Sequence, residues 1–482
     1  MADIFLGVDF GTTSAKCLAV DENGEILALA QYPYPLTRPR EGWAEQDPED
    51  YWRGLAETVR RCVEECKAKG YAKNDVAALA MSTQGGTLIL TDQSGTPLAP
   101  AISWMDGRAN VECDDLLAER GASFWYREIG NSLTAFSVAC KVRWLARRAP
   151  WVWDVEHRLC FVPDYLAMRL CGQFAIDVPS ASWTSLYSPL KRQWSEEILR
   201  VLESPLDGLS VPVESGTAIG ELLPEVAEEL GVGRNTKLVA GAFDQAAAGC
   251  GAGARADGRS VLSCGTAWVI YVVASSPVSD GKQRLCICCH TKPGEWGLVL
   301  PFTGGSAYDW LNRTLANTDP EHASGAEPLI FIPHLYGGLS PDWHSESRGS
   351  ILGLTLSHTP SDIRLAIMRG MAFEARRNLG AAEAVCGRSQ SVRMVGGAGK
   401  SQTWPQMIAN VLNRPVEVPE CVESACYGAA KLAAGAISER WTGMEPKRTF
   451  TPVAGDVQMA SRLFGKYLRF YAALLPVYGD EA

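Results

Sequence analysis

The hydrophobic pattern at the start of the chain is that of short β-strands joined by tight turns. Apolar residues alternate with others over 4–8, and apolar runs resume over 17–20 and 26–29. Turn-forming residues separate these runs, at 9–14 and at Asn23-Gly24. Because alternation of this kind between turn signals is typical of hairpins, the sequence predicts a meander of strands built around two sharp turns.

A helix is predicted directly after the meander. Asp47 suits the N-cap position and Pro48 the first helical position. Apolar side chains then recur at spacings of three and four and form one face: Trp52, Leu55, Val59, Cys62, Val63 and Cys66. A strand is predicted over 76–81, and strands and helices alternate further along the chain. This alternation predicts an α/β protein with at least partly parallel sheets.

The chain is long enough for more than one domain. Its 482 residues exceed the ~100–200 residues of a typical domain. The best candidate boundary lies near 237–260, where an apolar strand ends at Asp244 and a helix of small residues follows over 245–253. We therefore expect two domains, 1–243 and 244–482.

Composition narrows the classes of function. The net charge is −10 and no basic run stands out, so we do not expect a nucleic-acid-binding surface. No window offers about 18 consecutive apolar residues, and the start of the chain lacks a secretory leader. The 15 cysteines are mostly isolated, which suits reduced thiols. A cytoplasmic protein without a membrane span is expected.

One cysteine cluster resembles a metal site at first sight. Cys286, Cys288, Cys289 and His290 lie together, but their spacing is not that of a zinc site. Strand alternation would put Cys286 and Cys288 on one face and Cys289 on the other. A buried strand is the favoured interpretation, and a further role stays open.

Two Gly-Thr turns lie about 250 residues apart, each inside an apolar hairpin. Gly11 and Gly265 lack a Cβ atom, so their backbone N–H groups can approach a polyphosphate closely. The neighbouring hydroxyls add donors at the turns: Thr12, Thr13, Ser14 and Thr266. The repetition indicates two related halves whose turns face a common site. Two purely structural hairpin turns are the alternative.

Charged residues near the first turn fit a phosphate site. Asp9 ends a strand, where its carboxylate could hold a hydrated Mg²⁺ ion against the phosphates. Lys16 lies just beyond the turn and could add positive charge. Asp244 also follows an apolar strand, and a carboxylate there could take the proton from an attacking alcohol, with Gln245 bonding the same substrate. A plain helix cap is the alternative for Asp244.

A glycine-rich segment near residue 400 resembles a P-loop. The run 396–401 ends in Gly399-Lys400-Ser401, but the Walker pattern needs glycine where this chain has Met394. A strand and a helix flank the segment. We therefore favour a turn that accepts the flat face of a nucleoside.

Taken together, these segments resemble the family of carbohydrate kinases named for its FGGY motif. The resemblance covers nearly the whole chain, from residue 3 to about 435. It rests on several motifs in family order: Asp9-Phe10-Gly11-Thr12-Thr13-Ser14-Ala15-Lys16, Gly42-Trp43-Ala44-Glu45-Gln46-Asp47-Pro48, Trp104-Met105-Asp106-Gly107-Arg108 and Gly265-Thr266. It implies two RNase-H-like domains of the actin–hexokinase type, with ATP and sugar in the cleft between them.

The resemblance also implies roles for individual residues. Asp244 matches the catalytic base and Gln245 a substrate contact, while Gln84 and Trp104 fall in the substrate pocket. The nucleotide would contact four further positions: Gly305, Asp309, Gly397 and Ser401. A homodimer is expected by analogy.

The implied reaction is phosphorylation of a primary hydroxyl of a small sugar by ATP and Mg²⁺. A ketopentose such as D-xylulose is the first candidate. Another ketose, a sugar acid or a polyol (ribulose, gluconate, glycerol) is an alternative, and a non-catalytic actin-like ATP-binding protein is a third. Gly85-Gly86 stands where the glycerol-specific members have Arg-Glu, so we expect more room and no charged clamp there. Arg369 replaces an acidic residue or Gln in the family's second signature.

Overall fold

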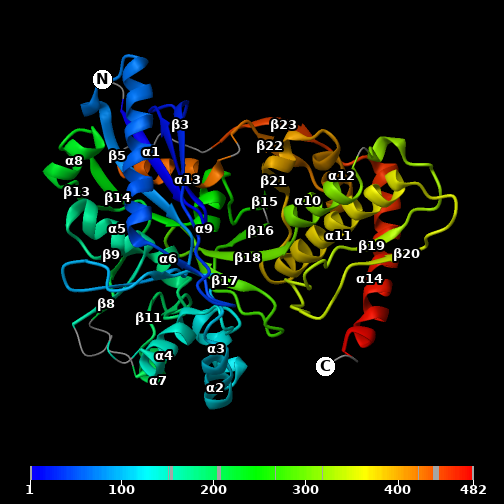
Figure 1. Ribbon diagram of the computed structural model, residues 1–482. Coiled ribbons are helices and arrows are strands. Elements are labelled where there is room, and N and C mark those ends of the chain that lie inside the picture. Colours follow the sequence, from blue (N-terminus) through cyan, green and yellow to red (C-terminus); the bar gives the residue numbers. More distant parts are fainter. Residues whose placement is uncertain are drawn as a thin grey trace.

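The computed structural model describes residues 3–149, 151, 156–203, 208–265, 267–316, 318–421, 423–437 and 444–479. Within them, one large mixed sheet organises each half of the chain (Figure 1). The α/β architecture predicted from the alternation of strands and helices is therefore confirmed.

The N-terminal sheet has the strand order β13-β14-β5-β1-β2-β3. Its strands are β1 (Ile4–Phe10), β2 (Ser14–Val20), β3 (Ile26–Pro33), β5 (Val76–Thr83), β13 (Ala218–Glu221) and β14 (Lys237–Phe243). β1, β2 and β3 pair antiparallel, which confirms the predicted meander, whereas β1, β5 and β14 run parallel. The parallel strands therefore end at the same edge of the sheet.

Helices cover both faces of this sheet. On one face lie α1 (Pro48–Ala68), α5 (Val162–Cys171) and α8 (Pro224–Leu230), which share a core with alternate residues of β1 such as Leu6 and Val8. α1 begins as predicted, with the Asp47 side chain accepting from the Glu49 N–H group and Pro48 in the first turn. The other face is covered by a helix from the opposite end of the chain, α13 (Ser424–Gly435).

The C-terminal sheet has the strand order β17-β18-β16-β15-β21-β22-β23. Its strands are β15 (Arg259–Cys264), β16 (Ala267–Ala274), β17 (Cys286–Cys289), β18 (Trp296–Thr303), β21 (Ser391–Gly396), β22 (Val416–Pro419) and β23 (Pro446–Phe450). The run β18-β16-β15-β21-β22 repeats the strand order and directions of β3-β2-β1-β5-β14. The two related halves inferred from the Gly-Thr turns are thus seen in the topology.

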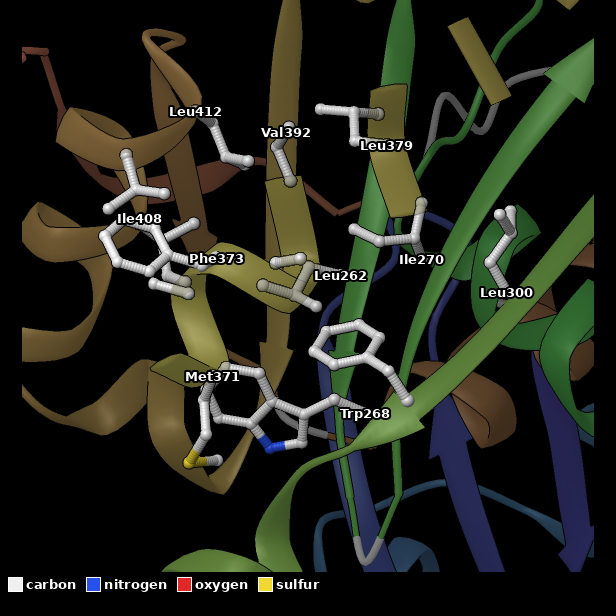
Figure 2. Packing of buried hydrophobic residues seen from close by; sticks show 14 of the residues in the cluster. Leu262, Trp268, Ile270, Leu300, Met371, Phe373, Leu379, Val392, Ile408 and Leu412 are labelled. Carbon is white, nitrogen blue, oxygen red and sulfur yellow. The ribbon is translucent and has the colours of Figure 1, made fainter. Parts of the chain in front are cut away.

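A large apolar core fills one face of the C-terminal sheet. Figure 2 shows Leu262, Trp268 and Leu300 on the strands facing Met371 and Phe373. The helices over this face are α10 (Gly305–Thr314), α11 (Pro360–Cys386), α12 (Thr403–Leu412) and α14 (Ala454–Gly479). β19 (Ile330–Ile332) and β20 (Ser350–Leu352) form a ribbon beside them. Each large side chain buried here contributes about 1.5–3 kcal/mol.

The opposite face of the C-terminal sheet is covered by α9 (Asp244–Gly251), which follows the last parallel strand of the N-terminal sheet. α9 thus follows the strands of one sheet and covers the other sheet, and α13 does the reverse; Figure 1 shows orange α13 among the blue and green elements. The two helices touch backbone to backbone, because a Cβ atom on Gly428 would lie 1.9 Å from the Ala247 carbonyl oxygen. Only glycine permits this approach.

A smaller subdomain extends from the N-terminal half. Its sheet has the order β4-β7-β6-β8, formed by β4 (Glu45–Gln46), β6 (Leu88–Thr91), β7 (Ala101–Ile102) and β8 (Arg158–Phe161). Its helices are α2 (Asn110–Arg120), α3 (Ala122–Ile129), α4 (Val138–Arg148), α6 (Val178–Ser182) and α7 (Glu196–Leu202). Two ribbons complete it, β9 (Ala175–Asp177) with β12 (Val211–Val213) and β10 (Tyr187–Ser188) with β11 (Gln193–Trp194). This subdomain supplies most of the cavity described below.

Candidate active site

Two carboxylates meet at the edge where the parallel strands of the N-terminal sheet end. In the strand register, Asp9 pairs with Ser82, and Ala242 pairs with the same serine from the other side. Asp244 follows two residues after Ala242 and begins α9. Asp9 and Asp244 therefore lie at one edge of the sheet, the edge where ligands bind in open α/β sheets.

Asp9 is poorly solvated and has few partners. The Ser82 hydroxyl donates to Asp9 Oδ1 at 2.6 Å. Burial raises the pKa of Asp9 to about 6, although the Ser82 hydrogen bond and the charge of Lys16 act in the opposite direction. A carboxylate whose charge is costly and incompletely compensated is suited to hold a cation.

Asp244 is the first residue of α9 and not its N-cap, which is Phe243. The Gln245 backbone N–H group donates to Asp244 Oδ1 at 2.7 Å. Burial, and then the negative charge of Asp9, raise the pKa of Asp244 to about 7, against the lowering effect of the hydrogen bonds from Gln245. A carboxyl with this pKa can accept a proton near neutral pH.

The first glycine turn is held rigidly by its carbonyl groups. The Tyr34 hydroxyl donates to the Gly11 carbonyl at 2.6 Å, and the Gln46 amide donates to the Thr12 carbonyl at 2.9 Å. The backbone N–H groups of Thr12 and Thr13 have no acceptor among the described residues. Gly11 has no positive φ, and a Cβ atom there would meet nothing closer than 3.6 Å. Internal packing thus does not require glycine at position 11. The missing side chain does leave the backbone of the turn accessible to a ligand.

Lys16 is engaged by the C-terminal half. Its Nζ lies 2.7 Å from Glu423 Oε2, next to the start of α13. Asp9 and Lys16 are register partners on β1 and β2, so the ammonium group lies beside the Asp9 strand position. The ion pair between Lys16 and Glu423 links the two halves of the chain. The role of Lys16 as a phosphate contact stays a prediction. Ser14 bonds the Gln31 amide through its hydroxyl at 3.1 Å.

Three of the glycines assigned to the nucleotide gather at one edge of the C-terminal sheet. Cys264 pairs with Gly396, so the following Gly265 and Gly397 lie at adjacent strand ends. Ala267 pairs with Thr303, which brings Gly305 to the same edge. Gly265 and Gly397 are exposed and have no positive φ. Thr266 lies outside the described residues.

The remaining nucleotide candidates lie on helices at this edge. Asp309 is exposed on α10, and the Ser401 hydroxyl accepts hydrogen bonds from the backbone N–H groups of Thr403 and Trp404 at the start of α12. The glycine-rich segment 397–400 forms a short 3₁₀-helix, and α12 begins only at Thr403. A P-loop would continue directly into its helix, so this geometry favours the adenosine turn.

A cavity of about 120 Å³ lies beside the N-terminal edge. Its lining combines aromatic, hydroxyl and amide side chains with bare backbone: Gly85, Gly86, Trp104, Ile129, Asn131, Thr134, Phe136, Ser137, Val138, Ser182, Trp183 and Ser185. Trp104 lines this cavity, and its indole N–H donates to Thr12 Oγ1 of the glycine turn at 3.1 Å; its contact with a sugar stays a prediction. The cavity is therefore joined to the candidate phosphate loop.

Gln84 is buried and is not among the residues that line this cavity. Its amide nitrogen donates to Tyr51 Oη at 2.8 Å and to Gln46 Oε1 at 3.0 Å, while its buried Oε1 atom has no partner among the described residues. A direct substrate contact by Gln84 stays a prediction.

The structure corrects the expectation that the missing side chain of Gly85 leaves more room in the pocket. A Cβ atom on Gly85 would lie 2.2 Å from Cδ1 of Trp183, so an indole ring fills the space that the missing side chain leaves. A Cβ atom on Gly86 would lie in ordinary van der Waals contact with its neighbours, at 3.8–3.9 Å. Sequence reasoning missed Trp183 and Phe136 as site residues. Neither has a spacing or charge pattern that could have revealed it.

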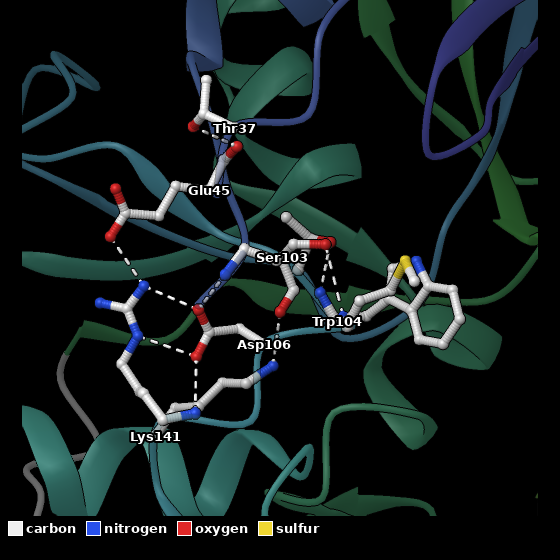
Figure 3. Close-up of polar contacts among 10 residues, drawn as sticks. Thr37, Glu45, Ser103, Trp104, Asp106 and Lys141 are labelled. Atoms are coloured by element: carbon white, nitrogen blue, oxygen red, sulfur yellow. Dashed lines mark hydrogen bonds and ion pairs between the residues drawn. The ribbon is translucent and has the colours of Figure 1, made fainter. Parts of the chain in front are cut away.

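A buried ionic network fixes the loop that carries Trp104 (Figure 3). Arg108 bonds both Asp106 and Glu45 at 2.7 Å, and its guanidinium lies 3.6 Å above the Trp43 ring. Lys141 is fully buried and donates from Nζ to the Ser103 carbonyl at 2.7 Å. Burial lowers the pKa of Lys141 to about 7. The network fixes Ser103, the residue directly before Trp104. It therefore also restrains the position of the Trp104 ring.

The cysteine cluster forms a buried strand, as favoured. Cys286 and Cys288 pack in one core and Cys289 in another. The Tyr271 hydroxyl and His290 Nδ1 lie 2.8 Å apart.

Among the described residues, no three His, Cys, Asp or Glu side chains are grouped to hold a metal ion, and no helix has the length and apolarity needed to cross a bilayer.

Comparison with known proteins shows the family of the chain. Residues 4–251 match the N-terminal domain of the FGGY family of carbohydrate kinases, and residues 261–437 match its C-terminal domain. The chain is 30% identical to xylulose kinase of Escherichia coli (strain K12) over 441 residues, 89% of each chain. It is 26% identical to gluconokinase of Bacillus subtilis (strain 168), over 90% of this chain and 87% of the relative.

A solved structure shows the same fold. Gluconate kinase from Lactobacillus acidophilus matches with a TM-score of 0.91 and 24% identity, over 100% of both chains. The two matched domains cover more than half of the sequence. The chain belongs to the FGGY family of carbohydrate kinases, with the actin–hexokinase type of fold.

Proposed function

We propose that the protein transfers the γ-phosphoryl group of ATP to a primary hydroxyl of a small sugar, with D-xylulose as the first candidate. The observation that carries this proposal is Asp244, a carboxyl with a pKa of about 7 at the strand edge shared with Asp9. The choice of sugar follows the relative with 30% identity, which is a xylulose kinase. Gluconate is the second candidate, since another relative is a gluconokinase.

In this mechanism, Asp244 orients the acceptor hydroxyl and takes its proton as the oxygen attacks phosphorus. A base is most effective when its pKa lies near the operating pH. Gln245, on the same helix turn, would hydrogen-bond the acceptor. Most of the rate enhancement would come from positioning and from charge stabilisation.

The two glycine turns would bind the nucleotide. The free N–H groups of Thr12 and Thr13, with the hydroxyl of Ser14, would face the phosphates from one side and Gly265-Thr266 from the other. At the C-terminal edge the adenosine would contact Gly305, Asp309, Gly397 and Ser401. Lys16 would add positive charge if its pair with Glu423 opens toward the phosphates.

Asp9 fits the Mg²⁺ ion that phosphoryl transfer commonly uses. Among the described residues, its carboxylate has one hydrogen-bond donor, Ser82, and burial makes its charge costly, so a cation would stabilise it. When bound, the ion would supply positive charge beside the phosphate oxygens.

Four further features belong to the same proposal. The first domain would end at 243 and the second begin at 244, so that Asp244 opens the helix that crosses to the other sheet. Gln84 and Trp104 would contact the sugar.

The protein would act in the cytoplasm, where ATP is supplied. The homodimer stays a prediction by analogy.

The test is a panel of sugars with coupled detection of ADP and identification of the phosphorylated product. We expect Asp244→Ala to lower kcat by ~10²–10⁴-fold while ATP still binds. Asp257→Ala is the matched control, because Asp257 is exposed and forms a surface ion pair with Arg255. Near-normal turnover by Asp244→Ala would remove the base from the mechanism. ATP binding without any sugar phosphate would favour the non-catalytic alternative.

A further inference from the structure

None of the described residues that line the acceptor cavity has a charged side chain. Among its lining residues, hydroxyl and amide groups provide the polarity, from Asn131, Thr134, Ser137, Ser182 and Ser185. Such groups both donate and accept hydrogen bonds, which matches the hydroxyls of a sugar. Trp104 and Phe136 are 43% and 55% exposed as residues, and aromatic rings offer flat apolar faces.

Two cations beside the Trp104 loop, Arg108 and Lys141, are held by other groups. Arg108 is fixed between Asp106 and Glu45, with only 3% of its side chain exposed. Lys141 is fully buried and donates to the Ser103 carbonyl. A carboxylate in the cavity would therefore lose its hydration without gaining an ionic partner, and it would lie near a sheet edge that already carries Asp9 and Asp244.

Trp183 forms the inner wall of this cavity. Its ring occupies the space above Gly85, 2.2 Å from the position of a Cβ atom. It also stacks on Phe243, with ring centroids 4.9 Å apart and an interplanar angle of 11°. Phe243 directly precedes Asp244. The indole thus connects the cavity floor at Gly85 with the strand end that carries the proposed base.

We propose that Trp183, seated over Gly85 and stacked on Phe243, is a specificity-determining residue of the acceptor cavity, and that the acceptor is an uncharged polyhydroxy sugar and not a sugar acid. This inference rests on the proposed function, since it names the acceptor class for the same site. The indole limits the depth of the cavity beside Asp244, and the lack of a cation excludes carboxylates.

The first experiment separates recognition from transfer. Calorimetric titration of the purified full chain with D-xylulose, D-ribulose, glycerol and D-gluconate measures binding, and ADP release measures turnover. We expect a neutral sugar to bind at least ~100-fold more tightly than gluconate, in the range that an unpaired buried group produces. Equal or tighter binding of gluconate, or no binding of any neutral acceptor, overturns the inference. A neutral sugar that binds but is not phosphorylated supports the inference and refutes the proposed kinase function.

The second experiment tests the coupling between Trp183 and Gly85. Trp183→Ala should weaken binding of the neutral acceptor by ~10–200-fold, the effect of losing an apolar wall, while ATP affinity stays the same. Trp183→Phe should retain part of the affinity. Trp151→Ala, at a half-exposed position outside the cavity, is the matched control and should change neither affinity.

Gly85→Ala provides the sharper readout. On its own it should weaken acceptor binding, because the new methyl group collides with the Trp183 ring. In the Trp183→Ala background the same methyl group has space, so the double variant should bind the acceptor better than Gly85→Ala alone. Independent, additive losses, or unchanged acceptor affinity in both Trp183 variants, would overturn the assignment. Preserved ATP affinity shows that each variant is folded.

Discussion

Replacing Asp244 by Asn should stabilise the ligand-free protein, and by an amount that depends on pH. The pKa of the Asp244 carboxyl is about 7 in the folded chain and 3.8 in its ordinary state. Asn has nearly the same shape and can still accept the Gln245 N–H bond, but it carries no charge. The substitution therefore removes a charge that burial and Asp9 make unfavourable.

The magnitude follows from linkage. Below pH ~4 the carboxyl is protonated in both folded and unfolded chains, so its raised pKa costs no stability. Above pH ~7 the carboxyl is ionised in the folded chain, where burial and Asp9 disfavour the charge. At about 1.4 kcal/mol per unit of pKa difference, the loss in free energy of unfolding reaches about 4 kcal/mol. At pH 5 the penalty is less than half of this. Stability attributable to protonated Asp244 is thus lost as pH rises from about 4 to about 7.

Unfolding of the full chain in chelator, at pH 5 and pH 8, is the assay. Asp244→Asn should unfold at a higher urea concentration or temperature than the unsubstituted protein at pH 8, and the difference should shrink at pH 5. Asp257→Asn, at an exposed position, should show no such dependence. A variant that is less stable at pH 8, or a difference equal at both pH values, would refute the reasoning.

Two other substitutions test the loop network and the helix contact. Lys141→Met should raise the acceptor KM by ~10-fold with little change in the ATP KM, because the unpaired Ser103 carbonyl costs about 1–3 kcal/mol and loosens the Trp104 loop; equal changes in both KM values would contradict this. Gly428→Ala should destabilise the protein by at least ~1–3 kcal/mol in urea unfolding, because its Cβ would lie 1.9 Å from a carbonyl oxygen. Gly435→Ala on the same helix, with nothing within 4 Å of the added methyl, is the control and should be neutral or stabilising.

The local elements could be predicted from the sequence because their signals are local. The meander, the Asp47 cap and the strand that ends at Asp244 each follow from turns, caps and alternation within a few residues. These signals also located both carboxylates at strand ends. Trp183 could not be found in this way, since its role depends on contact with Gly85, about 100 residues earlier.

The same limit applies to long-range packing. Lys16 suggested a phosphate contact because its chain neighbours form the glycine turn, and nothing nearby indicates the partner Glu423. The apolar residues of α13 predict a buried helix but not which sheet buries it. Such contacts are fixed by the tertiary arrangement, which local patterns do not encode.

Because α9 and α13 cross between the two sheets, neither of the matched domains, 4–251 or 261–437, carries all the helices that cover its own sheet. A fragment ending at residue 251 would lack α13 and would expose Phe5, Leu18 and Val239 to water. A fragment beginning at residue 261 would lack α9 and leave Val261 and Tyr271 uncovered. The two halves are therefore related in topology, but neither is expected to fold on its own. Each needs a helix from the other fragment to cover its sheet. Genetic separation of the halves would require both fragments in one cell to restore a soluble enzyme.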